Sequence, residues 1–177
     1  MDVVRVNDFD FRPFISHAMI QQRIKEIAAQ INHDLAKEKP LFIGILNGSF
    51  MFAADLLREL SIKSEITFVK LASYEGTQST GEVITRIGLD KPVKGRTVVI
   101  VEDIIDTGKT VHEMLRVLKK GKAARTIIAT LLLKPDALQY EIKVDYVGFK
   151  VPNDFLVGYG LDYDGLGRNL RDIYVKV

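Results

Sequence analysis

Apolar residues near the start of the chain recur at three- and four-residue intervals, a spacing that places them on one face of a helix. They are Ile20, Ile24, Ile27, Ile31 and Leu35. Ser16 offers a side chain that can cap the first turn, and Pro40 ends the segment. We therefore expect a helix between Ser16 and Pro40 that buries one face.

Beyond Pro40, uninterrupted apolar runs alternate with segments of helical spacing. The runs expected to form strands are 41–46, 66–71, 83–87, 97–101 and 126–133, with shorter strands near 146–149, 155–157 and 173–175. One helix is expected from the turn at 47–49 to about Leu60, and another over 110–120, where Gly121 ends it. Apolar strands that alternate with helices predict an α/β fold with a largely parallel central sheet.

Parallel sheets of this kind bind their ligands beyond the carboxyl ends of the strands. The loops that begin at Asn47, Glu102, Lys134 and Leu161 all follow predicted strands, so we expect them to converge on one edge of the sheet. The side chains of these loops are therefore the first candidates for a functional site.

Composition narrows the function classes. A chain of 177 residues fits a single domain, 1–177, and 25 Lys and Arg against 23 Asp and Glu leave a formal charge of +2, too small for bulk attraction to nucleic acid or membranes. The absence of cysteine excludes disulfides, thiolate metal sites and a cysteine nucleophile. The apolar run 127–133 is too short to span a bilayer, and the first residues lack the apolar centre of a signal peptide. A cytoplasmic protein without nucleic-acid or membrane partners is expected.

The segment 98–110 reads Val-Val-Ile-Val-Glu-Asp-Ile-Ile-Asp-Thr-Gly-Lys-Thr and carries the densest chemistry of the chain. Gly108 allows close approach of the backbone to a ligand, and the following helix directs its free amides toward the same point. Thr107, Lys109 and Thr110 add further donors. This combination predicts an anion site, most simply for a phosphate.

Glu102 and Asp103 stand side by side just before this site. Like charges about 4 Å apart repel by roughly 4 kcal/mol at an effective dielectric constant of 20, so a neutralising partner is expected. Water suffices if the pair is exposed, and a sugar diol with Mg²⁺ is the stronger candidate because hard oxygen ligands suit that ion. Gly108-Lys109-Thr110 also ends like a nucleotide-binding P-loop, but that motif needs a glycine at position 103, which is Asp.

Segment 98–110 resembles the phosphoribosyl-pyrophosphate signature of type I phosphoribosyltransferases, in the form found in hypoxanthine-guanine phosphoribosyltransferases. Between Leu41 and Arg171, further segments are similar to that family in the same order. These are Leu46-Asn-Gly-Ser-Phe50, Ser73-Tyr74 with Gln78-Ser-Thr-Gly81, Leu132-Leu-Lys134, and Val157-Gly-Tyr-Gly-Leu-Asp-Tyr163 followed by Arg168. The resemblance implies the type I fold, whose parallel sheet carries helices on its faces and a small hood formed by the terminal segments.

The resemblance also implies roles for the residues of the signature. Glu102 and Asp103 would contact the ribose hydroxyls and a magnesium ion, and Asp106 would accept the proton of purine N7 as general base. The 5′-phosphate of phosphoribosyl pyrophosphate would bind the whole turn, made of Asp106, Thr107, Gly108, Lys109 and Thr110. The alternative for Asp106 is a turn residue that caps the next helix.

Pyrophosphate would bind, by the same resemblance, to the turn of Asn47 and Gly48, to Arg168, and under a lid formed by 72–81, whose Ser73 and Tyr74 close over it. Many members of the family have lysine where this chain has Asn47, so any charge from that side chain is missing here. The alternatives are an ordinary strand-to-helix turn at Asn47 and a plain hairpin loop at Ser73.

The purine site implied by the resemblance uses four residues from the second half of the chain. They are Lys134 for the exocyclic oxygen at C6, Phe155 for stacking, Leu156 for main-chain contacts, and Asp162, which also binds a second magnesium ion through water. A lysine that reaches solvent and a core phenylalanine are the alternatives for Lys134 and Phe155. Gly167 departs from the aromatic residue that the family commonly has before the arginine.

The implied activity is purine salvage, in which a phosphoribosyl group passes from phosphoribosyl pyrophosphate to hypoxanthine or guanine, with Mg²⁺, in a homodimer or homotetramer. Two alternatives stay open. One is a regulator that binds phosphoribosyl pyrophosphate without catalysis, and the other is an enzyme specific for adenine or xanthine.

Overall fold

The computed structural model of the chain describes residues 3–72 and 84–177, so the predictions made for Ser73, Tyr74 and the rest of the lid lie outside the described residues. The elements in chain order are β1 (Val4–Val6), β2 (Phe9–Ile15), α1 (His17–Asp34), β3 (Leu41–Ile45), α2 (Phe50–Arg58), β4 (Glu65–Ala72), β5 (Ile84–Ile87), β6 (Thr97–Ile105), α3 (Lys109–Lys120), β7 (Arg125–Leu133), the 3₁₀ helix η1 (Pro135–Ala137), β8 (Tyr146–Lys150), β9 (Leu156–Val157) and β10 (Ile173–Lys176).

The main sheet has the strand order β5-β4-β3-β6-β7-β8. Its strands β4, β3, β6, β7 and β8 are mutually parallel, and β5 pairs antiparallel with β4 at the edge. This arrangement confirms the predicted α/β fold with a largely parallel central sheet. None of the helices among the described residues is long and apolar enough to cross a membrane.

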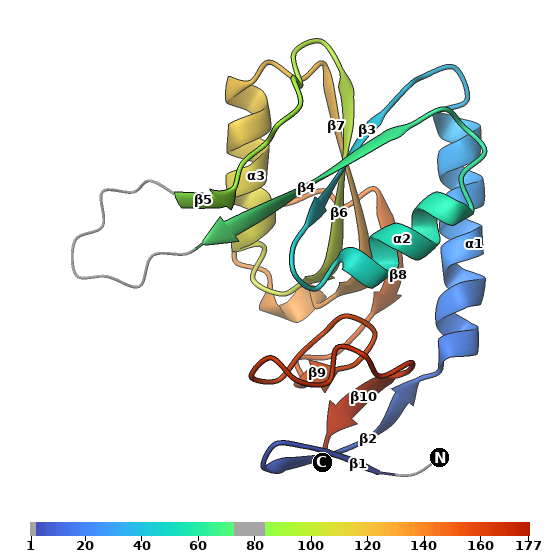
Figure 1. Cartoon of the computed structure of the whole chain (residues 1–177), viewed down its shortest axis with the longest axis vertical. Coiled ribbons are helices and arrows are strands. Elements are labelled where there is room, and N and C mark those ends of the chain that lie inside the picture. The colour runs from blue at the N-terminus through green and yellow to red at the C-terminus, as the bar shows by residue number, and fades with distance from the viewer. Residues whose placement is uncertain (1–2, 73–83) are drawn as a thin grey trace.

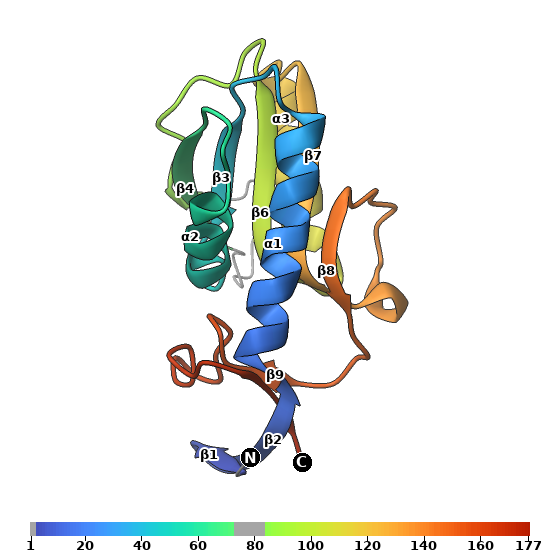
Figure 2. The same cartoon turned by 90° about the vertical axis from the view of Figure 1, so that its right-hand side faces the viewer.

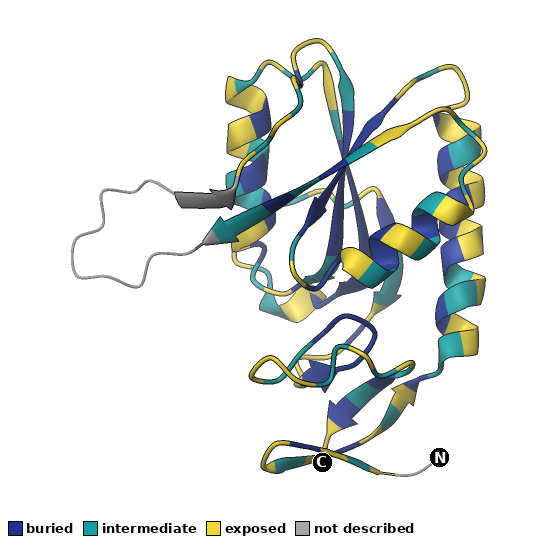
Figure 3. Cartoon of the chain, in the orientation of Figure 1, coloured by how far each residue is buried: buried dark blue, intermediate teal, exposed yellow. Residues whose placement is uncertain are grey.

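Helices cover both faces of the sheet, as Figures 1 and 2 show. Successive strand residues point to opposite faces, so Phe42 packs in the cluster that includes residues of α1 and α2, whereas Leu41 and Ile43 pack in the cluster that includes residues of α3. The helices turn buried faces toward the sheet and exposed faces outward (Figure 3). The predicted cap is present as well, since the Met19 amide donates to Ser16 Oγ at 3.4 Å.

A second, antiparallel sheet forms the hood, with the strand order β1-β2-β10-β9. It combines the first strands of the chain with the last and has its own small core around Val6, Phe11 and Val157. The hood formed by terminal segments, expected from the resemblance, is therefore confirmed. Its strands β1 and β2 were not predicted from the hydrophobic pattern.

The end of β6 differs from the sequence prediction, which ended the strand at Val101. In the structure, β6 continues to Ile105, because its ladder with β7 extends through the pairs Ile104–Leu132 and Ile105–Leu133. Glu102 and Asp103 therefore belong to the strand rather than to a loop, and their positions are set by the sheet.

Candidate active site

The carboxyl edge of the parallel strands faces the hood, as Figure 1 shows. The loops after β3, β6 and β7 begin at this edge, as predicted for the loops at Asn47 and Lys134, while the loop predicted from Glu102 begins only after Ile105. The fourth predicted loop, at Leu161, follows β9 of the hood and not a strand of the parallel sheet.

Glu102 is buried at the end of β6, with 6% of its surface exposed. Its Oε2 atom is inaccessible and has no hydrogen-bond partner among the described residues. Burial, followed by the negative charge of the neighbouring Asp103, raises the pKa of Glu102 well above its ordinary value. The end of β6 thus carries a buried carboxyl oxygen without a hydrogen-bond donor among the described residues.

Asp103 lies against the turn that follows β3. A Cβ atom added to Gly48 would lie 1.7 Å from Asp103 Oδ2, so the carboxylate occupies the space that glycine leaves open. The peptide bond between Leu46 and Asn47 in this turn is cis, and Asn47 itself is exposed and accepts a hydrogen bond from Lys70 Nζ at 3.3 Å. The turn from Leu46 to Gly48 and the end of β6 therefore form one continuous surface.

Asp106 and Lys134 meet where β6 and β7 end. Because Ile105 pairs with Leu133, the next residue of each strand emerges beside the other, and Lys134 Nζ lies 2.9 Å from Asp106 Oδ2. Lys134 is buried, with 7% of its surface exposed, whereas the Asp106 side chain is 51% exposed. The lysine therefore does not reach solvent, and its charge is met by the aspartate.

The turn after Asp106 has the geometry of an anion site. Gly108 has φ of +84° and stands at the N-cap of α3, and the Lys109 amide has a 3.4 Å contact with Thr107 Oγ1. Asp106 is thus not the cap of that helix, which was its alternative interpretation. The first amides of a helix have no acceptor within it, so those of α3 can bind a phosphate together with Thr107 and Thr110.

Phe155 and Leu156 lie where the hood begins. Phe155 is 45% exposed and packs edge-on against Tyr163, with ring centroids 5.6 Å apart, so it is not a core residue. Leu156 is buried in β9 and pairs with Val175 of β10. Nearly half of the Phe155 surface is therefore accessible to a ligand.

Asp162 and Arg168 form an ion pair, with Arg168 Nη2 at 2.7 Å from Asp162 Oδ1. Asp162 also accepts the Gly165 amide at 2.7 Å, and Arg168 Nη1 donates to the Gly160 carbonyl at 2.7 Å. Both charged groups are thus held by the hood loop, beside Gly160.

Contacts connect most of the predicted site residues. Asp106 joins Lys134, Asp103 packs on Gly48, and Gly160 links Gly48 to Arg168, since a Cβ on Gly160 would lie 2.2 Å from the Gly48 carbonyl oxygen. Lys70, a residue that the sequence reasoning did not select, contacts Asn47. Its place in a strand of mixed apolar and charged residues gave no signal, because only the pairing of β4 with β3 brings it to the turn.

The carboxyl pair fits a magnesium ion. Glu102 offers a buried oxygen without a partner, and Asp103 stands next to it at the same strand end. Among residues 3–72 and 84–177, no three or more His, Cys, Asp or Glu side chains lie close enough together to bind a metal ion by themselves. An ion bound to this pair would therefore take its remaining ligands from substrate and water, which is the usual coordination of Mg²⁺ at phosphates.

Comparison with protein families matches residues 16–164 to the phosphoribosyl transferase domain. The hypoxanthine-guanine phosphoribosyltransferase of Streptococcus pneumoniae is 42% identical over 162 residues, which cover 91% of this chain and 90% of the relative. The enzyme of the same name from Bacillus subtilis is also 42% identical over 162 residues, with the same coverage.

Solved structures agree with the sequence comparison. A hypoxanthine phosphoribosyltransferase from Staphylococcus aureus superposes with a TM-score of 0.89 at 37% identity and covers all of this chain and 98% of its own. A hypoxanthine-guanine phosphoribosyltransferase from Bacillus anthracis, with a HEPES molecule in the active site, gives a TM-score of 0.87 at 37% identity and covers 94% of this chain and 96% of its own.

Proposed function

The chain belongs to the phosphoribosyltransferase family, and from this premise we propose that it is a purine-salvage enzyme that transfers the phosphoribosyl group of phosphoribosyl pyrophosphate to hypoxanthine and guanine. The products are the nucleoside 5′-monophosphate and pyrophosphate. The enzyme class and the substrates rest on relatives that are similar over nearly the whole chain.

The observation that carries the choice of base is the pair formed by Lys134 and Asp106, whose charged atoms lie 2.9 Å apart. A 6-oxopurine has, on one edge, an acceptor at O6 and an N–H at N7. The Lys134 ammonium donates to the first, and the Asp106 carboxylate accepts from the second. Adenine places an amino group where Lys134 needs an acceptor, so the pair disfavours it.

The phosphate part of the substrate fits the turn from Thr107 to Thr110, where the amides of α3 and two hydroxyl groups converge. Its pyrophosphate fits the backbone of Asn47 and Gly48 and the guanidinium of Arg168, which binds a phosphoryl group through two parallel hydrogen bonds. Ser73 and Tyr74 keep their proposed role in the lid.

Glu102 and Asp103 are the proposed holders of one Mg²⁺ ion and of the ribose hydroxyls, and Asp162 of a second ion through water. Bound magnesium supplies charge stabilisation to the leaving pyrophosphate. The residues of the chain perform the other steps: Asp106 accepts the N7 proton as N9 attacks the anomeric carbon, Phe155 and Leu156 hold the base, and Arg168 stabilises the departing charge.

The test is turnover by the purified protein with phosphoribosyl pyrophosphate, Mg²⁺ and each of hypoxanthine, guanine, xanthine and adenine in competition. We expect the monophosphates of hypoxanthine and guanine, with one pyrophosphate released for each nucleotide formed. Binding of phosphoribosyl pyrophosphate without turnover of any base would instead identify a regulator, and adenosine monophosphate as the main product would reject the assignment of Lys134.

The proposal includes one phosphoribosyltransferase domain over 1–177, a cytoplasmic location and a homodimer or homotetramer. The single domain is supported by the hood, because β2 and β10 come from opposite ends of the chain and pair with each other. Light scattering after gel filtration measures the number of subunits.

A further inference from the structure

Three successive residues of the hood have left-handed backbone conformations. The φ angles are +99° at Gly158, +48° at Tyr159 and +100° at Gly160. Glycine adopts positive φ readily, whereas a bulky aromatic residue rarely does so. Contacts of the Tyr159 side chain must therefore hold this turn in place.

The Tyr159 side chain reaches from the hood to α2. Tyr159 is buried, and its hydroxyl group donates to Asp55 Oδ2 at 2.5 Å. Asp55 also accepts from Gln21 Nε2 of α1 at 2.7 Å. Burial, and then the bond to Asp55, raise the pKa of Tyr159, so the phenol keeps its proton and acts as a donor at neutral pH.

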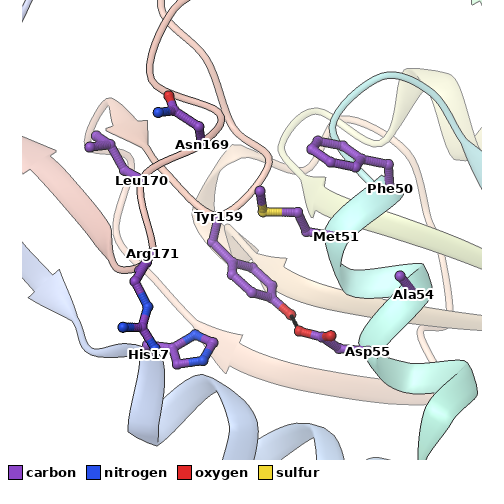
Figure 4. Close-up of a pocket in the computed structure, with 9 residues that line it drawn as sticks. All are labelled: His17, Phe50, Met51, Ala54, Asp55, Tyr159, Asn169, Leu170 and Arg171. Atoms are coloured by element: carbon purple, nitrogen blue, oxygen red, sulfur yellow. Dashed lines mark hydrogen bonds between the residues drawn. The ribbon is translucent and has the colours of Figure 1, made fainter.

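A cavity of about 300 Å³ lies beside the tyrosine ring. Figure 4 shows the side chains that line this cavity, which include Tyr159, Asp55, Phe50, Met51 and His17. Tyr159 is nevertheless only 3% exposed and packs in the main core cluster, so packing and the hydrogen bond to Asp55 together hold the ring.

Gly160, the last residue of the turn, touches two groups that the proposed function assigns to pyrophosphate. It packs directly on the Gly48 carbonyl oxygen, where a Cβ atom would approach to 2.2 Å. Its own carbonyl oxygen accepts from Arg168 Nη1 at 2.7 Å, and its amide donates to the Arg168 carbonyl at 3.0 Å. A shift of this turn would displace both Gly48 and Arg168.

We propose that Asp55 and Tyr159 are positioning residues for the pyrophosphate side of the site. The hydrogen bond between them connects the hood to α2, whose first residue, Phe50, lies two positions after Gly48 in the sequence. Gly160 is thereby held between the Gly48 backbone and the Arg168 guanidinium, the two groups that the proposed function assigns to pyrophosphate. This inference rests on the proposed function, because the pyrophosphate roles of Gly48 and Arg168 belong to it.

The experiment removes the hydroxyl group and keeps the ring. For Tyr159→Phe we expect the KM for phosphoribosyl pyrophosphate and the Kd for pyrophosphate with Mg²⁺, measured by calorimetry, to rise about threefold to tenfold, with the KM for hypoxanthine unchanged. Asp55→Ala should behave in the same way, whereas Asp55→Asn, which keeps an acceptor oxygen, should restore values near the wild type. The double variant Tyr159→Phe/Asp55→Ala should be no worse than either single variant.

A matched tyrosine–aspartate pair elsewhere in the molecule provides the control. Tyr146 of β8 is buried, and its hydroxyl group donates to Asp34 Oδ2 of α1 at 2.7 Å. Tyr146→Phe should lower Tm without changing either KM. If Tyr159→Phe changes both KM values equally, or changes only Tm as Tyr146→Phe does, the positioning role is wrong. A wild-type protein without turnover would reject the proposed function, and the pyrophosphate titration would still test the positioning role.

Discussion

The proposed site has two halves that differ in how their charges are paired. The purine half consists of Asp106, Lys134, Phe155, Leu156 and Asp162, and the phosphate half consists of Glu102, Asp103 and the turn 107–110. In the purine half, Lys134 is paired with Asp106 at 2.9 Å, and Asp162 is paired at 2.7 Å with Arg168, a residue that the proposal assigns to pyrophosphate. In the phosphate half, Glu102 Oε2 is buried without a hydrogen-bond partner among the described residues, next to a second acid, and the first amide of α3 has only a 3.4 Å contact with Thr107 Oγ1. The free protein is therefore electrostatically satisfied on one side and unsatisfied on the other.

This difference predicts two kinds of binding. The O6 and N7–H groups of a purine replace the existing contact between Lys134 and Asp106. Purine binding therefore contributes mainly selectivity, because a base that offers the wrong groups leaves Lys134 and Asp106 without hydrogen-bond partners. Phosphoribosyl pyrophosphate with Mg²⁺ instead places a cation beside the carboxyl groups of Glu102 and Asp103 and a phosphate beside the first amides of α3. Its binding should therefore supply most of the affinity. The predictions below test this division, in order of decreasing effect.

The largest effect is expected from Asp106→Asn, which removes the general base and keeps an oxygen that can accept from Lys134. We expect kcat with hypoxanthine to fall about 10²- to 10⁴-fold, because Asp106 no longer takes the N7 proton. The Kd of phosphoribosyl pyrophosphate, measured by calorimetry with Mg²⁺, should stay close to that of the wild type.

The matched control for this variant is Asp136→Asn, which neutralises an exposed acid close by in η1 and should leave kcat unchanged. Equal losses in turnover and in phosphoribosyl-pyrophosphate affinity for Asp106→Asn would break the division between the halves, since Asp106 would then belong to both.

A smaller effect is expected from Lys134→Met, which keeps the length and the apolar stem of the side chain. Loss of a charged hydrogen-bond donor to O6 should raise the KM for hypoxanthine about 10- to 100-fold. The KM for phosphoribosyl pyrophosphate should be unchanged, and the preference for hypoxanthine over adenine should decrease, as measured by competition.

Lys109→Met is the corresponding lysine variant in the phosphate half and serves as the control for Lys134→Met. Lys109 is the first residue of α3. The variant should raise the KM for phosphoribosyl pyrophosphate and leave that for hypoxanthine unchanged. A Lys134 variant that discriminates between the bases as well as the wild type does would show that the ammonium group does not recognise O6.

The contrast between the halves also explains how much of the site the sequence could predict. Glu102, Asp103 and the turn 107–110 of the phosphate half lie in one short segment, so a strand, a glycine and a helix start placed them together without knowledge of the fold. The burial of Glu102 was harder to foresee, because the extension of β6 to Ile105 depends on pairing with β7. The sequence pattern could not tell a loop carboxylate from one held inside a sheet.

The purine half is assembled from distant segments, and its internal contacts were not predictable. Lys134 and Asp106 are 28 residues apart, and the same holds on the pyrophosphate side, where Tyr159 and Asp55 are 104 apart. Sequence spacing carries no information about pairs at such separations, because strand order decides which ends meet. The resemblance supplied the residues, but only the structure shows that the charges of the free site are paired with each other.

The smallest effect concerns stability and tests the unsatisfied half directly. Glu102→Gln removes a carboxyl group whose ionisation is disfavoured by burial and by Asp103, so the free energy of unfolding of the free protein should rise by about 1 kcal/mol at neutral pH. For a chain of this length that corresponds to an increase in Tm of about 2–4 °C. Added Mg²⁺ with phosphoribosyl pyrophosphate should stabilise the variant less than the wild type, because the carboxylate that meets the cation is gone.

The pH dependence gives this prediction a definite sign. The pKa of Glu102 is raised in the folded protein by burial and then by Asp103, so the folded state binds this proton more tightly than the unfolded chain does. Below the ordinary glutamate pKa both states are protonated, and wild type and variant should be equally stable. As pH rises through and above that value, the wild type should lose stability relative to Glu102→Gln, until the folded-state pKa is passed. Glu59→Gln, at an exposed position just after α2, should show no such divergence. A wild type that instead gains stability over Glu102→Gln with rising pH would mean that Glu102 is already paired in the free protein, and the contrast between the halves would be lost.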